Sequence, residues 1–153
     1  MIKIYVLGGY QPSVANQGDA GIDLKYCGPH AIPIVQGIVH KLHTGMYVEI
    51  PEGKCGIIFE RSGLGAKYGV NILGRIIDSG YRGEIIVILD RNSNRIYDSE
   101  KGYEEMQNLI INPGDKIAQM VITDCNPEFQ MVGSKYDLSN TSRGEKGLGS
   151  SGK

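Results

Sequence analysis

The apolar residues of this chain come in short runs, and none is longer than a β-strand. The longest, residues 85–89, falls far below the roughly 18 apolar residues that span a membrane. Turn-forming residues separate these runs, with 22 Gly and 6 Pro among 153 residues. Long helical periodicity is nearly absent. This pattern predicts one all-β domain built as a sandwich, jelly roll or barrel.

The individual runs predict where the strands lie. Apolar and polar residues alternate over 2–6 and again over 46–50, as in half-buried strands. Residues 56–59, 70–77 and 117–122 form further strand-like stretches, the last one following the turn Pro113-Gly114-Asp115. Residues 85–89 are apolar at every position, so we expect a central strand covered on both faces.

Three segments depart from the strand pattern. One short helix is predicted over residues 62–67, with Ser62 as its N-cap. Residues 90–107 are rich in charge and predict an extended loop or a hairpin excursion. Residues 139–153 hold one large apolar side chain, Leu148, too little to order a segment. We therefore expect a folded domain over 1–138 and a flexible C-terminal arm over 139–153.

Charge and cysteine content exclude several classes of protein. The net charge is −1, from 16 Lys+Arg and 17 Asp+Glu, so a generally nucleic-acid-coating protein is not expected. Cys27, Cys55 and Cys125 form no CxxC pair, and His40 and His43 are too isolated to indicate a zinc site. The N-terminus lacks a signal peptide's apolar core, so we expect a cytoplasmic protein without membrane contact.

Five segments are Gly-rich and polar, and each adjoins an apolar strand. Glycine lets backbone N–H groups approach an anion, while Ser and Arg side chains donate hydrogen bonds to it. Such segments therefore fit a phosphate-binding site, but each also has a plainer explanation as a capped helix, a turn or a solvated terminus. The five are DAGIDL at 19–24, RSGL at 61–64, GRIIDSGYRGE at 74–84, GDKIAQM at 114–120 and RGEKGLGSSG at 143–152.

Two residues in these segments carry specific alternatives. Asp78 follows an apolar pair and is either a general base at a strand end or an Asx-turn residue. Arg61 precedes Ser62 at the predicted helix start, so the pair is either an anion site or a surface Arg beside an N-cap.

In this order and spacing, the five segments resemble the motifs of the trimeric dUTPase family, over nearly the whole chain. The resemblance implies a β-clip, distorted jelly-roll subunit and a homotrimer with three active sites shared between chains. It implies hydrolysis of dUTP to dUMP and pyrophosphate, with Mg²⁺ bound by the triphosphate. The sequences of the motifs suggest a bacterial or phage-like member of the family.

The resemblance also assigns roles by position. Asp78 would activate the attacking water, Gln119 would donate its amide to a phosphate or to that water, and Tyr81 would exclude a 2′-OH. Asp23 would lie near the metal's water shell, with no protein ligand to the metal itself. The remaining substrate-binding residues would be Arg61, Ser62 and Gly63 for phosphates; Ile72, Gly74 and Ile77 for uracil; Arg143 for the γ-phosphate; and Leu148, Gly149, Ser150 and Ser151 for closure of the arm.

The chain departs from the family pattern at a few places. Leu148 stands where an aromatic residue usually stacks on uracil, Arg75 where Gly is frequent, and Glu60 where Pro often precedes the motif Arg. The 90–107 excursion is longer than in minimal members. These departures affect recognition of the base rather than the reaction class.

Two other functions are alternatives to dUTP hydrolysis. The related dCTP deaminases need a catalytic Glu that would fall at Ile88, and an aliphatic side chain cannot shuttle protons. The second is a binding module with this fold that regulates a protein partner, for which the 90–107 excursion is the candidate surface. Release of pyrophosphate from dUTP separates an enzyme from a pure binder.

Overall fold

The computed structural model describes residues 1–14, 16–92, 95–105 and 107–141. They form a mostly-β structure with one short α-helix, as predicted from the sequence. The elements are β1 Lys3–Val6, β2 Ile22–Lys25, β3 Ile32–Ile34, β4 His40–Glu49, β5 Lys54–Glu60, α1 Ser62–Tyr68, β6 Val70–Leu73, β7 Ile76–Ile77, β8 Glu84–Arg91, β9 Arg95–Asp98, β10 Gly102–Glu105, β11 Leu109–Ile111, β12 Lys116–Asp124 and the 3₁₀ turn η1 Lys135–Asp137.

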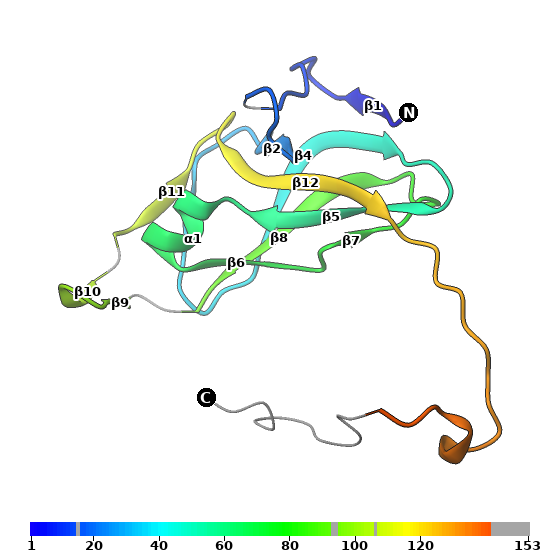
Figure 1. Cartoon of the computed structure of the whole chain (residues 1–153). Helices are drawn as coiled ribbons and strands as arrows, with labels where there is room; N and C mark the ends of the chain where they lie inside the picture. The colour runs from blue at the N-terminus through cyan, green and yellow to red at the C-terminus, as the bar shows by residue number, and fades with distance from the viewer. Residues whose placement is uncertain (15, 93–94, 106, 142–153) are drawn as a thin grey trace.

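Two four-stranded antiparallel sheets pack as layers (Figure 1). One has the strand order β1-β4-β8-β6 and the other β2-β12-β5-β7. Small two-stranded sheets, β3-β11 and β9-β10, lie at the periphery. The sheets do not close on themselves, so a barrel is excluded and a jelly-roll-like sandwich remains.

Both large sheets contribute to one hydrophobic core. Leu42 and Val87 from the first sheet and Ile58 and Met120 from the second are each 1% exposed or less. Burial of a side chain of this size stabilises a fold by about 1.5–3 kcal/mol. Strands β4, β8 and β12 supply half of the buried core residues, and the burial of Met46, Val48 and Ile50 confirms the alternation predicted over 46–50.

Strand β8 differs from its prediction. It is an interior strand of its sheet, but only every second residue is buried, with Ile85, Val87 and Leu89 inside. Ile86 and Ile88 lie on the other face and line an open cleft. The expectation of a strand covered on both faces within this chain is therefore wrong, because no layer of the chain packs over the second face of β8 in the described residues.

Helix α1 confirms the predicted helix, but Ser62 is not its N-cap. Arg61 occupies the cap position in an extended conformation (φ −75°, ψ 134°), and no side chain caps the helix. Ser62 is already the first helical residue, so its hydroxyl is not used for capping. The helix ends at Gly69, whose left-handed φ of 62° favours glycine.

Two segments extend from the sandwich. The 90–107 excursion contains the hairpin β9–β10, which confirms the hairpin alternative (Figure 1). After β12, the described chain up to residue 141 runs away from the two sheets. Within it, Ser134 and Asp137 form a capping box around η1. Among the described residues, no helix has the length and apolar character needed to cross a membrane.

Candidate active site

A cleft of about 340 Å³ brings together several of the predicted site residues, and we call it the Asp78 cleft. Gly74, Ile77, Asp78 and Tyr81 all line it, as the sequence predicts for one shared site. Its other lining residues are Lys41, Ile76, Glu84, Ile86 and Ile88. Ile72 is 2% exposed and does not line this cleft with its side chain. The cleft is thus largely aliphatic, with a few polar groups at fixed places.

Asp78 owes its position to strand pairing and a tight turn. Strand β7 pairs with β5 in the register Gly56↔Ile77, so Asp78 follows directly at the strand end. The Tyr81 N–H donates to the Asp78 carbonyl at 3.1 Å, which closes the turn. The turn uses the backbone carbonyl of Asp78, which leaves its side chain free of the turn, and Asp78 lines the cleft. This arrangement supports the general-base alternative.

The Tyr81 side chain is anchored to the backbone of Glu84, three residues further along the chain. Its hydroxyl donates to the Glu84 carbonyl at 2.8 Å, and the side chain remains 42% exposed toward the cleft. A Cβ atom at Gly83 would fall on the Tyr81 ring and hydroxyl. Gly83 is therefore required for this ring position, and the ring forms a fixed wall beside Asp78.

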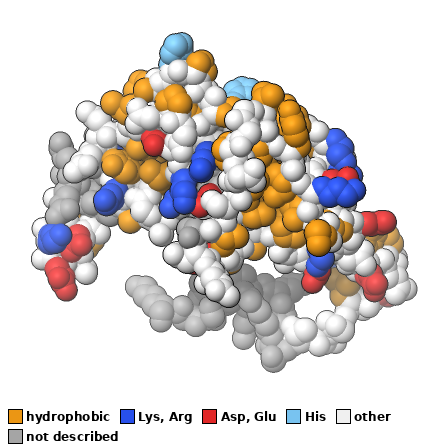
Figure 2. Space-filling model, turned by 90° about the horizontal axis from the view of Figure 1, so that it is seen from above, with side chains coloured by type: hydrophobic (Ala, Val, Ile, Leu, Met, Phe, Trp, Pro, Cys, Tyr) orange, Lys and Arg blue, Asp and Glu red, His pale blue; other side chains and the backbone are white. Residues whose placement is uncertain are grey.

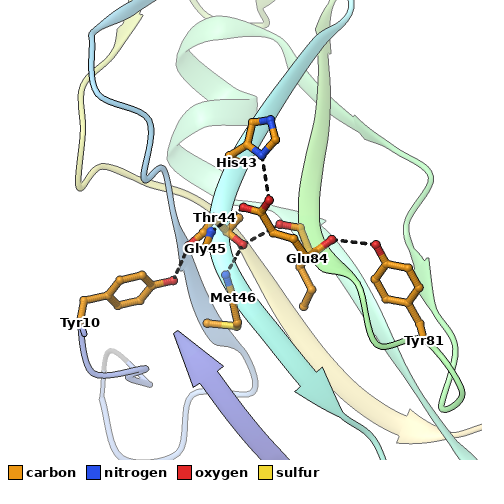
Figure 3. A network of polar contacts seen from close by, with 8 residues as sticks. Tyr10, His43, Thr44, Gly45, Met46, Tyr81 and Glu84 are labelled. Carbon is orange, nitrogen blue, oxygen red and sulfur yellow. Dashed lines mark hydrogen bonds and ion pairs between the residues drawn. The ribbon is translucent and has the colours of Figure 1, made fainter. Parts of the chain in front are cut away.

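Glu84 links this wall to strand β4 (Figure 3). Its Oε1 accepts the Gly45 N–H at 2.7 Å, and its Oε2 lies 2.9 Å from His43 Nδ1. The strands β4 and β8 lose register here, and Gly45 adopts a left-handed φ of 64°. The Thr44 hydroxyl donates to the Ile85 carbonyl at 2.6 Å and accepts the Met46 N–H at 3.1 Å. The irregular stretch is thereby fully hydrogen-bonded rather than loose.

The charge state of Glu84 follows from these contacts. Burial alone would raise the pKa of its carboxyl, but hydrogen bonds from His43 and from the Gly45 and Thr44 N–H groups outweigh burial and lower the pKa below 4.5. Glu84 is therefore ionised at neutral pH. A role for Glu84 could not be predicted from the sequence, because its partners lie 39 and 41 residues away and leave no local signal.

A second set of predicted residues gathers around Asp23, and we call it the Arg61 cluster. Asp23 is 5% exposed and pairs with Arg61 Nη1 at 2.5 Å and Lys116 Nζ at 2.7 Å. Gln119 lies opposite Asp23 in the β2–β12 register, and its side chain is 3.0–3.3 Å from where a Cβ of Gly21 would stand. Residues from three of the Gly-rich segments thus meet here.

A cleft of about 520 Å³ adjoins the Arg61 cluster. Three cationic side chains line it, those of Arg61, Lys67 and Lys116, together with Gly63. Ser62 is exposed beside them. Such a surface favours anions, and this supports the anion-site alternative for Arg61 and Ser62.

The two sets of residues lie apart in one chain. Their clefts share no lining residue among those described. Asp78 lies across from Cys55 near the start of β5, whereas Arg61 follows the end of that strand. Six residues of extended strand correspond to roughly 20 Å. Arg143, Leu148, Gly149, Ser150 and Ser151 lie outside the described residues.

Comparison with known proteins decides the family. The family model dUTPase matches residues 10–152. The chain belongs to the dUTPase family. A curated relative is the deoxyuridine 5′-triphosphate nucleotidohydrolase of Paramecium bursaria Chlorella virus 1, 33% identical, covering 99% of this chain and 96% of the relative. The same enzyme of Gamma-proteobacterium EBAC31A08 is 36% identical, covering 92% and 94%.

Solved structures agree with the family assignment. The dUTPase of Staphylococcus bacteriophage 80alpha with dUpNHpp is 27% identical, with a TM-score of 0.78 over 99% of this chain and 98% of that one. The dUTPase of phage phi11 of S. aureus, described as coordinating a structural Mg(II) ion, shares the fold with a TM-score of 0.70 at 24% identity, over 88% and 98% of the chains. The relatives thus include bacterial, viral and phage dUTPases, in agreement with the predicted bacterial or phage-like type.

Proposed function

We propose that this dUTPase-family protein hydrolyses dUTP to dUMP and pyrophosphate by attack of water on the α-phosphorus. This reaction limits uracil in DNA and supplies dUMP for thymidylate synthesis. The observation that carries the proposal is the Asp78 cleft, where a strand-end carboxylate and an anchored tyrosine ring line one mostly aliphatic cavity. A cavity of this kind suits a base and a sugar rather than a polyphosphate.

In this proposal Asp78 accepts the proton of the attacking water. Asp78 lines the cleft while its carbonyl closes the turn with Tyr81, so the backbone fixes the position of the residue that carries the base. A positioned general base contributes about 10²–10⁴-fold to a rate. Hydrolysis of a phosphoanhydride otherwise depends mainly on orientation and on neutralising charge.

Tyr81 and the neighbouring backbone recognise the nucleoside. The Tyr81 ring, held through the Glu84 carbonyl, lies under the deoxyribose and leaves no room for a 2′-OH. The backbone N–H and C=O groups of Ile72, Gly74 and Ile77 read uracil in the manner of a paired base. This role needs no side chain from Ile72, which is consistent with its burial.

The phosphates are handled by the Arg61 cluster. Arg61, Ser62 and Gly63 bind phosphate oxygens, and Gln119 donates its amide to an oxygen or to the attacking water. Asp23 orients the Arg61 guanidinium before substrate arrives. From the arm over 139–153, Arg143 binds the γ-phosphate, and Leu148, Gly149, Ser150 and Ser151 close over the nucleotide.

Mg²⁺ bound to the triphosphate would neutralise charge and orient the phosphates for attack. Asp23 is a poor direct ligand, since two cationic groups already engage its buried carboxylate. Oxygen ligands from the substrate and water suit Mg²⁺, which keeps several waters when it binds. We therefore assign the ion to the substrate phosphates, with Asp23 facing its water shell when Lys116 or Arg61 moves aside.

We propose a homotrimer with active sites shared between chains. The roughly 20 Å along β5 between the Asp78 and Arg61 ends exceeds the reach from an α-phosphate to its neighbouring phosphates. One chain therefore supplies Asp78 and a neighbour supplies Arg61. Exposed apolar side chains provide surface for such contacts, including Ile76 at 64% and Phe129 at 82% (Figure 2 shows hydrophobic side chains spread over one face).

A binding role for the β9–β10 hairpin is the second candidate. Tyr97 and Tyr103 form an edge-on ring pair with centroids 5.1 Å apart, and they are 64% and 72% exposed. Exposed aromatic pairs suit a protein partner. Free thiols at Cys27, Cys55 and Cys125 fit a reducing cytoplasm for either role.

Release of pyrophosphate from dUTP, UTP, dCTP and dTTP tests the function, with Mg²⁺ present. We expect turnover of dUTP and a kcat/KM for UTP lower by about 100-fold. Ammonia from dCTP would indicate a deaminase instead. No pyrophosphate from dUTP would overturn the enzymatic function and leave only the binding role.

A further inference from the structure

At two positions where this sequence differs from the family pattern, 75 and 60, the side chains contact each other. Arg75, where Gly is frequent, lies with Nη2 3.0 Å from Oε2 of Glu60, where Pro is frequent. The side chains are 39% and 33% exposed, but Glu60 Oε2 itself is shielded from solvent. The contact is an ion pair rather than an aligned hydrogen bond, and Arg75 is the cation that compensates this shielded oxygen.

Arg75 also ties down the turn that precedes β7. Its Nε–H donates to the Ile72 carbonyl at 2.9 Å, which closes the turn through the side chain. Its own carbonyl accepts the Ile58 N–H at 2.8 Å and so extends the β5–β7 pairing. Between these anchors Gly74 adopts a left-handed φ of 58°, a strained conformation for other residues.

This turn is a wall of the Asp78 cleft. Gly74, Ile76 and Ile77 line the cleft, and all lie within two residues of Arg75. Glu60, at the end of β5, immediately precedes Arg61 of the other cluster. The ion pair therefore joins the end of β5 to the backbone that contacts the base in the proposed function.

We propose that Arg75 and Glu60 act as one positioning pair that fixes the base-binding turn over residues 72–77. This rests on the proposed function. The pair touches no reacting atom, so it acts on nucleotide binding rather than on the chemical step. A backbone held in its binding conformation loses less entropy when ligand arrives. An Arg75 side chain folded over the base is the competing arrangement, and in that case Glu60 would not matter.

Steady-state kinetics with dUTP test the pair through Arg75→Gly, Glu60→Gln and the double variant. We expect Arg75→Gly to raise KM about three- to tenfold with kcat within about twofold. Glu60→Gln should raise KM by a smaller factor, and the double variant should not exceed Arg75→Gly, because the two side chains act as one. Arg75→Lys keeps a cation for Glu60 but loses the Nε–H bond to the Ile72 carbonyl, so its KM should lie between those of the wild type and Arg75→Gly.

Controls separate positioning from stability. A folding defect lowers kcat per mole of protein and leaves KM unchanged. Lys3→Ala removes a comparable ion pair, Lys3–Glu49, at the β1–β4 edge and should leave KM unchanged. An unchanged KM in Arg75→Gly would overturn the proposed pair. So would a double variant whose rise in KM is the product of the rises in the two single variants.

Titration with dUpNHpp, which needs no hydrolysis, separates this proposal from the proposed function. Binding by the wild type with a three- to tenfold weaker affinity in Arg75→Gly supports the pair even if turnover is not found. If the wild type hydrolyses dUTP and both it and Arg75→Gly bind dUpNHpp with equal affinity, the positioning pair is overturned and the proposed function stands. Wild-type protein that neither binds dUpNHpp nor hydrolyses dUTP overturns both.

Discussion

The Asp78 cleft and the Arg61 cluster are built in opposite ways. The Asp78 cleft has aliphatic walls, and its polar groups are fixed through backbone contacts and one ionised carboxylate, Glu84. The Arg61 cluster is a set of cations held around the buried carboxylate of Asp23. The first construction suits a neutral base and sugar, and the second suits phosphates.

In the proposed function, this separation makes each of them one half of a site. A cleft that must exclude a hydroxyl needs rigid walls, while cations that must meet phosphates need a counter-charge to hold them in place beforehand. In the proposed function, the two lie about 20 Å apart along β5 and meet only when chains assemble. Substitutions at Asp78, Tyr81 and Glu84 test this division of roles.

The largest expected effect concerns the chemical step. Asp78→Asn should lower kcat for dUTP by about 10²–10⁴-fold, because the amide cannot accept the water's proton. Affinity for dUpNHpp should change little, since the Asp78 carbonyl still closes the turn. Rapid-quench kinetics and calorimetric titration measure the two quantities. A variant that keeps more than about a tenth of kcat would remove Asp78 from the role of base.

Next comes discrimination between sugars. Tyr81→Ala should lower the ratio of kcat/KM for dUTP to that for UTP by about tenfold or more, because the wall against a 2′-OH is removed. Tyr81→Phe keeps the ring and loses only the hydrogen bond to Glu84, so most discrimination should remain. Competition between the two nucleotides gives the ratio directly. An unchanged ratio in Tyr81→Ala would show that another group excludes ribose.

The smallest effect concerns the support behind Tyr81. Glu84→Gln should lower the free energy of unfolding by about 1–2 kcal/mol at pH 7, because charge-assisted hydrogen bonds to His43 and Gly45 are lost. The pKa of Glu84 is below 4.5 in the folded protein, so its contribution is present above that pH and disappears as pH falls through the folded pKa. The difference between the two proteins should therefore shrink in acid.

Urea unfolding from pH 7 to acid measures this difference, at one protein concentration because assembly of the proposed trimer would contribute to stability. Glu52→Gln, at an exposed turn, serves as the matched control and should change nothing. A pH-independent difference for Glu84→Gln would mean that the carboxylate is not the stabilising form.

The sequence predicted what local patterns determine. Alternation over 2–6 and 46–50 located β1 and the last part of β4, and the turn at Pro113-Gly114-Asp115 located the start of β12. Resemblance to the dUTPase family brought Asp78 and Tyr81 into one site, and the structure places both on one cleft. These features depend on neighbours within a few residues, or on motifs whose order along the chain is itself informative.

Long-range contacts could not be predicted. His43 meets Glu84 across a register shift, and Arg75 meets Glu60 across the β5–β7 pairing, so neither pair has a sequence signal. The open face of β8 could not be predicted. The sequence of an all-apolar strand is the same whether its second face packs within its own chain or lines a cleft. The N-cap at Arg61 was missed because residue preference favours Ser62, whereas backbone conformation decides.

Mixing two inactive variants tests the central claim that one site combines the Asp78 end of one chain with the Arg61 end of another. Asp78→Asn and Arg61→Gln proteins, each of which we expect to be nearly inactive, are co-refolded in equal amounts. In randomly mixed trimers, about a quarter of the sites would combine an intact Asp78 with an intact Arg61, so pyrophosphate release should recover to about a quarter of wild type. Activity no greater than that of the two variants alone would place both residues of each site in one chain and contradict the account.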